Sequence, residues 1–142
     1  MKNNCLTFSQ PVIKDYYIGI IRIDENNIFS KEYIDTANKC FSLIQKHDGD
    51  VNQFLGGIIL ALWGVPLSFT NDKDNCLNFF DDLKKSNLPV SVILKRDKGL
   101  YGAFGDGKRT VVTAISKVIS NTLNEIMNCN NGTFTNDLKQ QI

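Results

Sequence analysis

Three glycines spaced three residues apart, Gly99, Gly102 and Gly105, have a spacing that could serve phosphate chemistry. Glycine-rich loops let backbone N–H groups approach a phosphate, and the basic pairs Lys95-Arg96 and Lys108-Arg109 would add positive charge nearby. Glycines within strands more often mark bulges or the close approach of two backbones, and charged turns are commonly solvated. The run therefore favours a structural role over a phosphate site.

The cysteines and the single histidine are too far apart to indicate a metal site. Zinc ligands normally come in pairs a few residues apart, whereas Cys5, Cys40, Cys76 and Cys129 are scattered and His47 lies near none of them. The sequence predicts reduced thiols that pack as small apolar side chains, and it predicts no metal and no cofactor. His47 is expected to be a surface cation at the C-terminal end of a helix.

The composition is typical of a globular domain and excludes several functional classes. The chain has 142 residues, 42% of them hydrophobic, and its 16 Lys and Arg nearly balance 15 Asp and Glu. We expect one domain over residues 1–142, with its core at about 17–127 and a polar tail at 130–142 that is frayed. The balanced charge argues against nucleic-acid binding. The longest apolar run, Ile58 to Trp63, is far shorter than the ~20 residues of a membrane span, and no apolar leader is present, which favours the cytoplasm.

The hydrophobic pattern predicts strands and helices in the order β-α-β-β-α-β-β-β-α. Gly56-Gly57 is a two-residue hairpin signal, and Lys95 to Lys98 is expected to form a charged turn. This order predicts an α+β domain with a mostly antiparallel sheet and helices on one face. The expected strands are Tyr17–Ile23, Val51–Leu55, Ile58–Trp63, Val90–Leu94, the glycine run and Thr110–Ile115, and the expected helices are Lys31–His47, Asp74–Lys85 and Lys117–Asn128.

The hairpin carries more apolar side chains than one face of a small sheet needs. Because strand residues alternate between faces, Ile58, Leu60 and Leu62 would point one way, and Ile59 and Trp63 the other. With helices on one face only, the second set would form an exposed apolar patch. The sequence therefore predicts self-association through the sheet face and the hairpin.

Two segments resemble the catalytic domain of class III adenylate and guanylate cyclases. The stretch Gly49 to Pro66, GDVNQFLGGIILALWGVP, is similar to the hairpin of that family, G-x-h-D-K-F-I-G-D-x-h-h-A-h-F-G-x-P, where h is apolar. Residues 97–109 resemble the family's G-x-h-h-h-G-N-I-G-S-x-x-R run, with Asp97 in place of the first glycine. The resemblance covers about Tyr17 to Met127. It implies a ferredoxin-like cyclase fold that works as a head-to-tail dimer.

The family's reaction closes the ribose 3′-hydroxyl of a nucleoside triphosphate onto the α-phosphate and expels pyrophosphate. Two divalent metals, held by two carboxylates, assist it. The resemblance places Arg22 at the first carboxylate position, at the end of the first strand, and Gly57 at the second, at the hairpin tip. A two-residue slip in the match would instead put Asp24 at the first position, as a residual carboxylate. Neither match supplies both carboxylates.

The other cyclase positions are also changed. By the resemblance, Gln53 stands for the lysine that reads adenine, Lys117 for the purine-selecting aspartate, Ser120 for the ribose-orienting asparagine and Asn124 for the transition-state arginine. Loss of that arginine removes the cation that meets charge developing on the phosphates. The resemblance therefore implies a degenerate cyclase-like domain that is catalytically inactive and acts as a regulatory or dimerisation module in signalling.

Several alternatives stay open at this point. The partner would be a second copy, giving a homodimer, or another cyclase-like domain, giving a heterodimer, and weak nucleotide binding is not decided. The rival function is a working nucleotidyl cyclase that converts ATP or GTP to a cyclic nucleotide with groups completed by a partner chain. A diguanylate-cyclase relative is disfavoured, because its G-G-D/E-E-F hairpin tip is absent after Gly56-Gly57.

Overall fold

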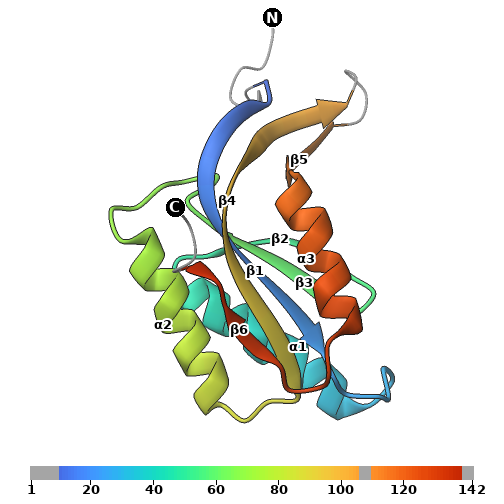
Figure 1. The fold of residues 1–142 in the computed structure, drawn as a ribbon. Helices are drawn as coiled ribbons and strands as arrows, with labels where there is room; N and C mark the ends of the chain where they lie inside the picture. Colours follow the sequence, from blue (N-terminus) through green and yellow to red (C-terminus); the bar gives the residue numbers. More distant parts are fainter. Residues whose placement is uncertain (1–9, 106–109, 139–142) are drawn as a thin grey trace, which may run out of the picture.

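A curved six-stranded sheet with three helices packed against it makes up the computed structural model, which describes residues 10–105 and 110–138 (Figure 1). The strand order is β2-β3-β1-β4-β5, and β6 pairs with β4. None of the helices in these ranges has the length and apolar character needed to cross a membrane. The elements are β1 (Val12–Ile23), α1 (Lys31–Lys46), β2 (Asp50–Leu55), β3 (Ile58–Trp63), α2 (Asp72–Lys85), β4 (Val90–Gly105), β5 (Thr110–Ile115), α3 (Lys117–Asn128) and β6 (Phe134–Asn136).

The fold class is α+β with a mostly antiparallel sheet, as the sequence predicts, but helices cover both faces. Helices α1 and α2 pack on one face, against residues such as Ile21 of β1 and Ile59 of β3. Helix α3 packs on the other face, against Ile18 and Ile20. The expectation of helices on one face is wrong because the central strands are apolar at both odd and even positions, a pattern typical of strands that are buried on both sides.

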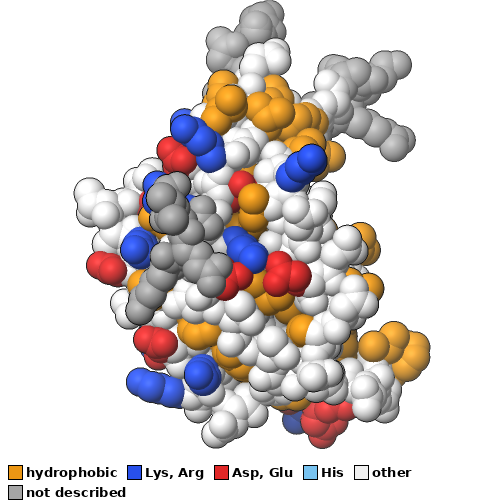
Figure 2. All heavy atoms as spheres, in the orientation of Figure 1, with side chains coloured by type: hydrophobic (Ala, Val, Ile, Leu, Met, Phe, Trp, Pro, Cys, Tyr) orange, Lys and Arg blue, Asp and Glu red, His pale blue; other side chains and the backbone are white. Residues whose placement is uncertain are grey.

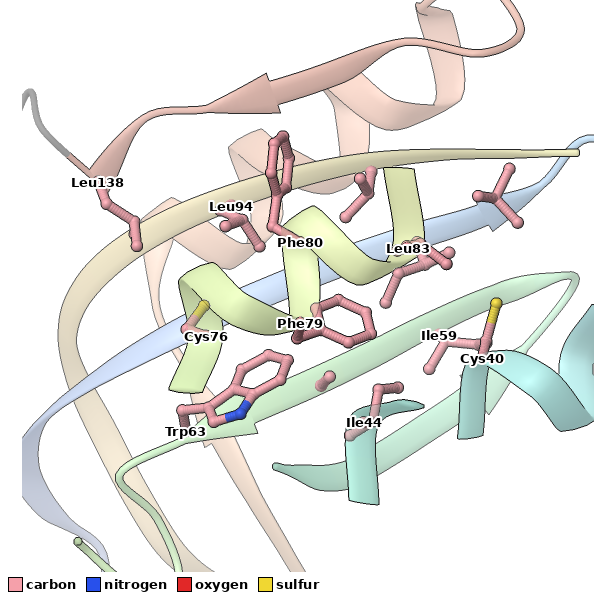
Figure 3. Close-up of a cluster of buried hydrophobic side chains, with 14 residues drawn as sticks. Cys40, Ile44, Ile59, Trp63, Cys76, Phe79, Phe80, Leu83, Leu94 and Leu138 are labelled. Atoms are coloured by element: carbon pink, nitrogen blue, oxygen red, sulfur yellow. The ribbon is translucent and has the colours of Figure 1, made fainter. Parts of the chain in front are cut away.

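Both apolar sets of strand β3 consequently lie in the core. Ile59 and Trp63 are fully buried under α1 and α2, and Leu60 and Leu62 are buried on the α3 side. The exposed patch expected on this sheet face is therefore wrong. Figure 3 shows Trp63 beside Phe79 of α2, with the two ring centroids 5.1 Å apart.

Strand β4 is longer than the sequence pattern suggests. Lys95 to Lys98 do not form a turn but lie inside this strand of 16 residues, since β1 pairs with it from Val12 opposite Tyr101 to Ile23 opposite Val90. The glycine run forms the second half of β4, where a side chain at Gly99 would collide with the Tyr16 hydroxyl group. This agrees with its structural interpretation. Lys108 and Arg109 lie outside the described residues.

The polar tail is structured as far as residue 138, contrary to the expectation for residues 130–142. Strand β6 runs parallel to the first half of β4, with Phe134 opposite Val92. The Phe134 ring lies 5.6 Å from that of Phe80 in α2, centroid to centroid, and Leu138 is buried. These two apolar side chains, isolated in a polar segment, explain why it docks. Residues 139–142 lie outside the described ranges.

The cysteines behave as the sequence predicts. Cys40, Cys76 and Cys129 are free thiols, and Cys5 lies outside the described residues. Burial raises the pKa of Cys40 to about 12 and also raises the pKa of Cys76. Both thiols therefore stay protonated at neutral pH and pack as apolar groups in the core of Figure 3.

Gly49 provides a test of packing around Trp63. A Cβ atom at Gly49 would come within 2.6 Å of Trp63 Cε2 and 2.8 Å of Ile44 Cγ2. The indole cannot easily withdraw, because its Nε1 donates to the His47 carbonyl oxygen at 2.9 Å. We expect Gly49→Ala to lower the free energy of unfolding by about 1–3 kcal/mol in urea denaturation.

Gly56→Asn is the control for this substitution. Gly56 has a φ of 62°, which asparagine tolerates, and no heavy atom lies within 4 Å of a Cβ built there. Its effect should stay below about 0.5 kcal/mol. Equal stability of Gly49→Ala and the wild type would contradict the packing described for Trp63.

Candidate functional site

Arg22 and Asp24, the two residues that compete for the first carboxylate position, form an ion pair at the end of β1. Arg22 Nε lies 2.8 Å from Asp24 Oδ1, and the side chains are only 17% and 3% exposed. The pair therefore lies mostly out of water, where a charge needs bonded partners.

Arg22 also binds the C-terminal end of α3. Its Nη1 donates to the carbonyl oxygens of Ile126 at 2.6 Å and Cys129 at 3.0 Å. Its Nη2 donates to Ser91 Oγ at 3.3 Å and Asn131 Oδ1 at 3.1 Å. Carbonyl groups at a helix C-terminus carry partial negative charge and stabilise a cation. The guanidinium thus binds to the sheet, the helix and the loop that follows it.

Both carboxylate oxygens of Asp24 are bonded within the chain. Oδ1 accepts from Arg22, and Oδ2 accepts from the Ser91 hydroxyl group at 2.7 Å and from the Gly132 backbone N–H at 2.8 Å. Ser91 Oγ in turn accepts from the Thr133 backbone N–H at 3.2 Å. We call Arg22, Asp24, Ser91 and the bonded backbone of residues 126–133 the Arg22 clasp.

The Arg22 clasp does not fit a divalent metal ion. Magnesium and manganese require several oxygen ligands, whereas the Asp24 oxygens are engaged and a guanidinium stands beside them. Gly57 supplies no ligand, and its φ of 78° together with the Tyr33 hydroxyl oxygen 2.8 Å from a built Cβ means that a carboxylate side chain there would be strained and would require Tyr33 to move. Over the described ranges, no three His, Cys, Asp or Glu residues cluster as metal ligands would.

The remaining predicted positions surround a groove between the β2–β3 hairpin, β5 and α3. The groove has a volume of about 320 Å³, and Gln53 and Ser120 lie in its wall. Lys117 and Asn124 are exposed on α3, each next in sequence to a wall residue. None of the wall residues within the described ranges is charged. Its apolar wall consists mainly of Leu55, Ile58, Leu60, Ile115, Ile119 and Leu123.

Side chains connect β2 to β5, although these strands lie at opposite ends of the strand order. Gln53 Nε2 donates to Thr113 Oγ1 at 2.9 Å, and Thr113 Oγ1 donates to Asn52 Oδ1 at 2.8 Å. A shift in pairing register between Val51 and Gln53 marks a bulge here, and bulges redirect side chains. We call Asn52, Gln53 and Thr113 the edge bridge. It commits the Gln53 amide nitrogen to a contact within the chain.

His47 is not the surface cation expected from its position. It forms the C-cap of α1, but its side chain is only 14% exposed and its Nε2 lies 2.7 Å from Asp82 Oδ2 of α2. This hydrogen bond lowers the pKa of Asp82 below its usual value. The pair fastens α1 to α2 rather than facing a ligand.

Comparison with known proteins identifies the fold. The sequence matches no protein-family model and no curated protein. The adenylyl cyclase CyaB from P. aeruginosa matches with a TM-score of 0.72 and 13% identity over 89% of this chain and 78% of that one. The guanylyl cyclase Cya2 matches with a TM-score of 0.66 and 16% identity over 87% of this chain and 75% of that one. The chain has the class III nucleotidyl cyclase fold.

A third solved structure with the cyclase fold is described as a dimer. The guanylyl cyclase domain of the RhoGC fusion protein from the aquatic fungus Blastocladiella emersonii, described as a non-canonical dimer, matches with a TM-score of 0.68 and 11% identity. That match covers 89% of this chain and 80% of the other.

Within this cyclase fold, the predicted positions fall into two groups. Arg22, Asp24 and Gly57 lie together, since the Gly57 carbonyl oxygen accepts from the Ile23 backbone N–H at 3.0 Å, beside the Arg22 clasp. The second group surrounds the groove. It consists of Gln53, Lys117, Ser120 and Asn124.

Sequence reasoning missed the partners that hold these positions. Ser91 is a fully buried hydroxyl within the apolar segment VSVIL, and such a residue needs a hydrogen-bond partner. That signal was available in the sequence. Asn52 and Thr113 carry no such signal, because their contact joins strands that are not neighbours in the sheet.

Charge removal at Arg22 tests the clasp. Arg22→Met keeps the apolar stem but leaves Asp24 buried without its cation, so we expect a loss of about 3–5 kcal/mol in the free energy of unfolding. Lys46→Met, which breaks a largely exposed pair with Asp82, is the control and should cost less than about 1 kcal/mol. The measurement is urea denaturation of both variants. Equal losses in the free energy of unfolding would mean that the clasp stabilises the protein no more than the exposed pair does.

The His47–Asp82 pair predicts a pH dependence. Because the folded-state pKa of Asp82 lies below its unfolded value of 3.8, the stabilisation is fully present above that value and is lost as the pH falls through the folded-state pKa. The stability difference between wild type and Asp82→Asn should therefore shrink progressively as the pH falls below about 5. Asp81→Asn controls for the change in net charge. A difference that stays constant for Asp82→Asn would contradict the assignment.

Proposed function

We propose that this chain is a catalytically inactive cyclase-like domain that serves as a regulatory or dimerisation module in cytoplasmic signalling. The observation that carries the proposal is the Arg22 clasp. Transfer at a phosphate needs metal ions to neutralise the developing charge, and here a guanidinium and a fully bonded Asp24 stand where the sequence match expects a metal ligand.

The groove, which the second group of predicted positions surrounds, supports the same proposal. Its described wall residues carry no charge, and Asn124, at the position matched to the transition-state arginine, is neutral. A developing oxyanion would therefore lack the cation that this position supplies in the cyclase match. The edge bridge also occupies Gln53 Nε2, at the position matched to the base-reading lysine.

A second cyclase-like domain is the partner we propose, either another copy of this chain or a related one. The guanylyl cyclase domain of RhoGC is dimeric by its description and shares the fold. The surface of this chain retains exposed apolar side chains, among them Phe29 at 89%, Leu55 at 82% and Met127 at 61% exposure. Apolar side chains exposed to this degree provide surface that a partner domain could cover.

An activity assay tests whether the domain lacks cyclase activity. Purified protein with ATP or GTP and Mn²⁺ should form no cyclic nucleotide above the blank without enzyme, because Asp24 is fully bonded within the Arg22 clasp and neutral Asn124 replaces the transition-state arginine of the cyclase match. Arg22→Asp in the same preparation should also be inactive, since Gly57 adds no second ligand.

Two results would count against this proposal. Product that disappears with a chelator would show that the chain is itself a cyclase. Product formed only after a second cyclase-like chain is added would support the alternative, in which a partner completes the site.

A further inference from the structure

We propose that Ile28 and Phe29 of one copy insert into the apolar groove of a second copy, so that each groove is filled by protein in a two-fold dimer. This inference rests on the proposed function, because it names the partner and the contact of a domain that pairs. We call Ile28 and Phe29 the apolar tip.

The apolar tip is exposed but held in place. Phe29 is 89% exposed and Ile28 is 57% exposed, and Ile34, within the first turns of α1, adds further exposed apolar surface. The Phe29 backbone N–H donates to Asn27 Oδ1 at 3.0 Å, and Ser30 Oγ donates to the Asn27 carbonyl oxygen at 2.8 Å. A loop that is already ordered loses little conformational entropy when it binds.

The groove has the size and character that such a tip requires. A cavity of about 150 Å³ lined by apolar side chains is enough to hold benzene, and this groove measures about 320 Å³. It therefore has room for the Phe29 ring together with part of a neighbouring side chain. Leu55, one of its wall residues, is 82% exposed and would be covered by the insertion.

The charges on the two surfaces are compatible with this contact. The wall residues that the structure describes are uncharged, and so are the residues of the tip from Asn26 to Ser30, so none of these side chains carries an ion that loses its hydration on insertion. Glu25 and Glu32 flank the tip, and Lys117 follows the wall residue Ser116. Opposite charges at the rim would guide the two surfaces together.

The tip and the groove lie on one side of the molecule, as a two-fold dimer requires. Figure 1 shows the loop before α1, the β2–β3 turn and α3 along the same side. Tyr33 of α1 approaches Gly57 of that turn, which brings the start of α1 close to the groove. In Figure 2, hydrophobic side chains gather along this edge, over the loop before α1 and beside α3. Two copies related by a two-fold axis would make the contact twice.

Sedimentation of two complementary variants tests the proposal. Phe29→Ser removes the tip, and Ser120→Phe fills the groove from α3. Each should weaken self-association at least tenfold relative to wild type, since burial of the aromatic side chain is lost. Leu67→Ser removes an equally apolar side chain, 68% exposed, outside the tip and groove, and should leave the Kd unchanged.

Mixing the two variants gives the sharper test. The intact tip of Ser120→Phe fits the intact groove of Phe29→Ser, so the mixture should form a heterodimer through one contact, more tightly than either variant associates alone. Circular dichroism of each variant shows that it is folded before it is mixed. A heterodimer that appears in the mixture supports the pairing of tip with groove.

Other results overturn the inference in distinguishable ways. If Phe29→Ser dimerises as well as wild type, the tip is not the contact, although a dimerisation module by another face survives. If wild type stays monomeric at several hundred micromolar, both the tip contact and self-association fail, whereas catalytic silence is decided by the activity assay. If wild type binds neutral phosphatidylcholine vesicles through Phe29 and does not dimerise, the tip is a lipid anchor and the inference is wrong.

Discussion

A guanidinium that has lost most of its contact with water needs oxygen atoms for its N–H groups, and Arg22 finds them in separate parts of the chain. Asp24 follows β1, Ser91 lies in β4, and the carbonyl oxygens of Ile126 and Cys129 end α3. Removing Arg22 would leave the Asp24 carboxylate buried without its cation. One side chain of β1 thus ties the C-terminal end of α3 to the sheet, in addition to the apolar packing of that helix.

At the groove, the edge bridge likewise gives polar side chains hydrogen-bond partners within the chain. Gln53 occupies the position that the cyclase resemblance connects with the nucleotide base, and in this chain its amide nitrogen donates to Thr113. Polar groups at both halves of the expected site are thus satisfied within the protein. A cyclase fold can persist without a metal under these conditions, because its buried polar groups do not depend on a ligand for their hydrogen bonds.

Much of the fold could be predicted because it follows from local patterns. The Gly56-Gly57 turn, with φ values of 62° and 78°, and the three amphipathic helices each follow from residues close in sequence. The apolar residues at odd and even positions of β3 do indicate that both faces are covered, but they do not say which helix covers which face. The docking of residues 130–138 was not predicted for a related reason. Phe134 packs against Phe80, a residue distant in sequence, and no local pattern indicates that contact. At the site, residue identities at Arg22 and Gly57 were readable, whereas their partners were not.

The separation in sequence of the clasp residues has a consequence for biosynthesis. Arg22 and Asn131 lie 109 residues apart, and β6 joins β4 only at the end of the described chain. Contacts between such distant residues form late, after shorter loops have closed. While the chain is being synthesised from its N-terminus, β1 to β4 must exist for a time with the Arg22 and Asp24 charges unsheltered by α3. That interval is when a nascent chain of this kind is most exposed to capture by chaperones or to misassembly.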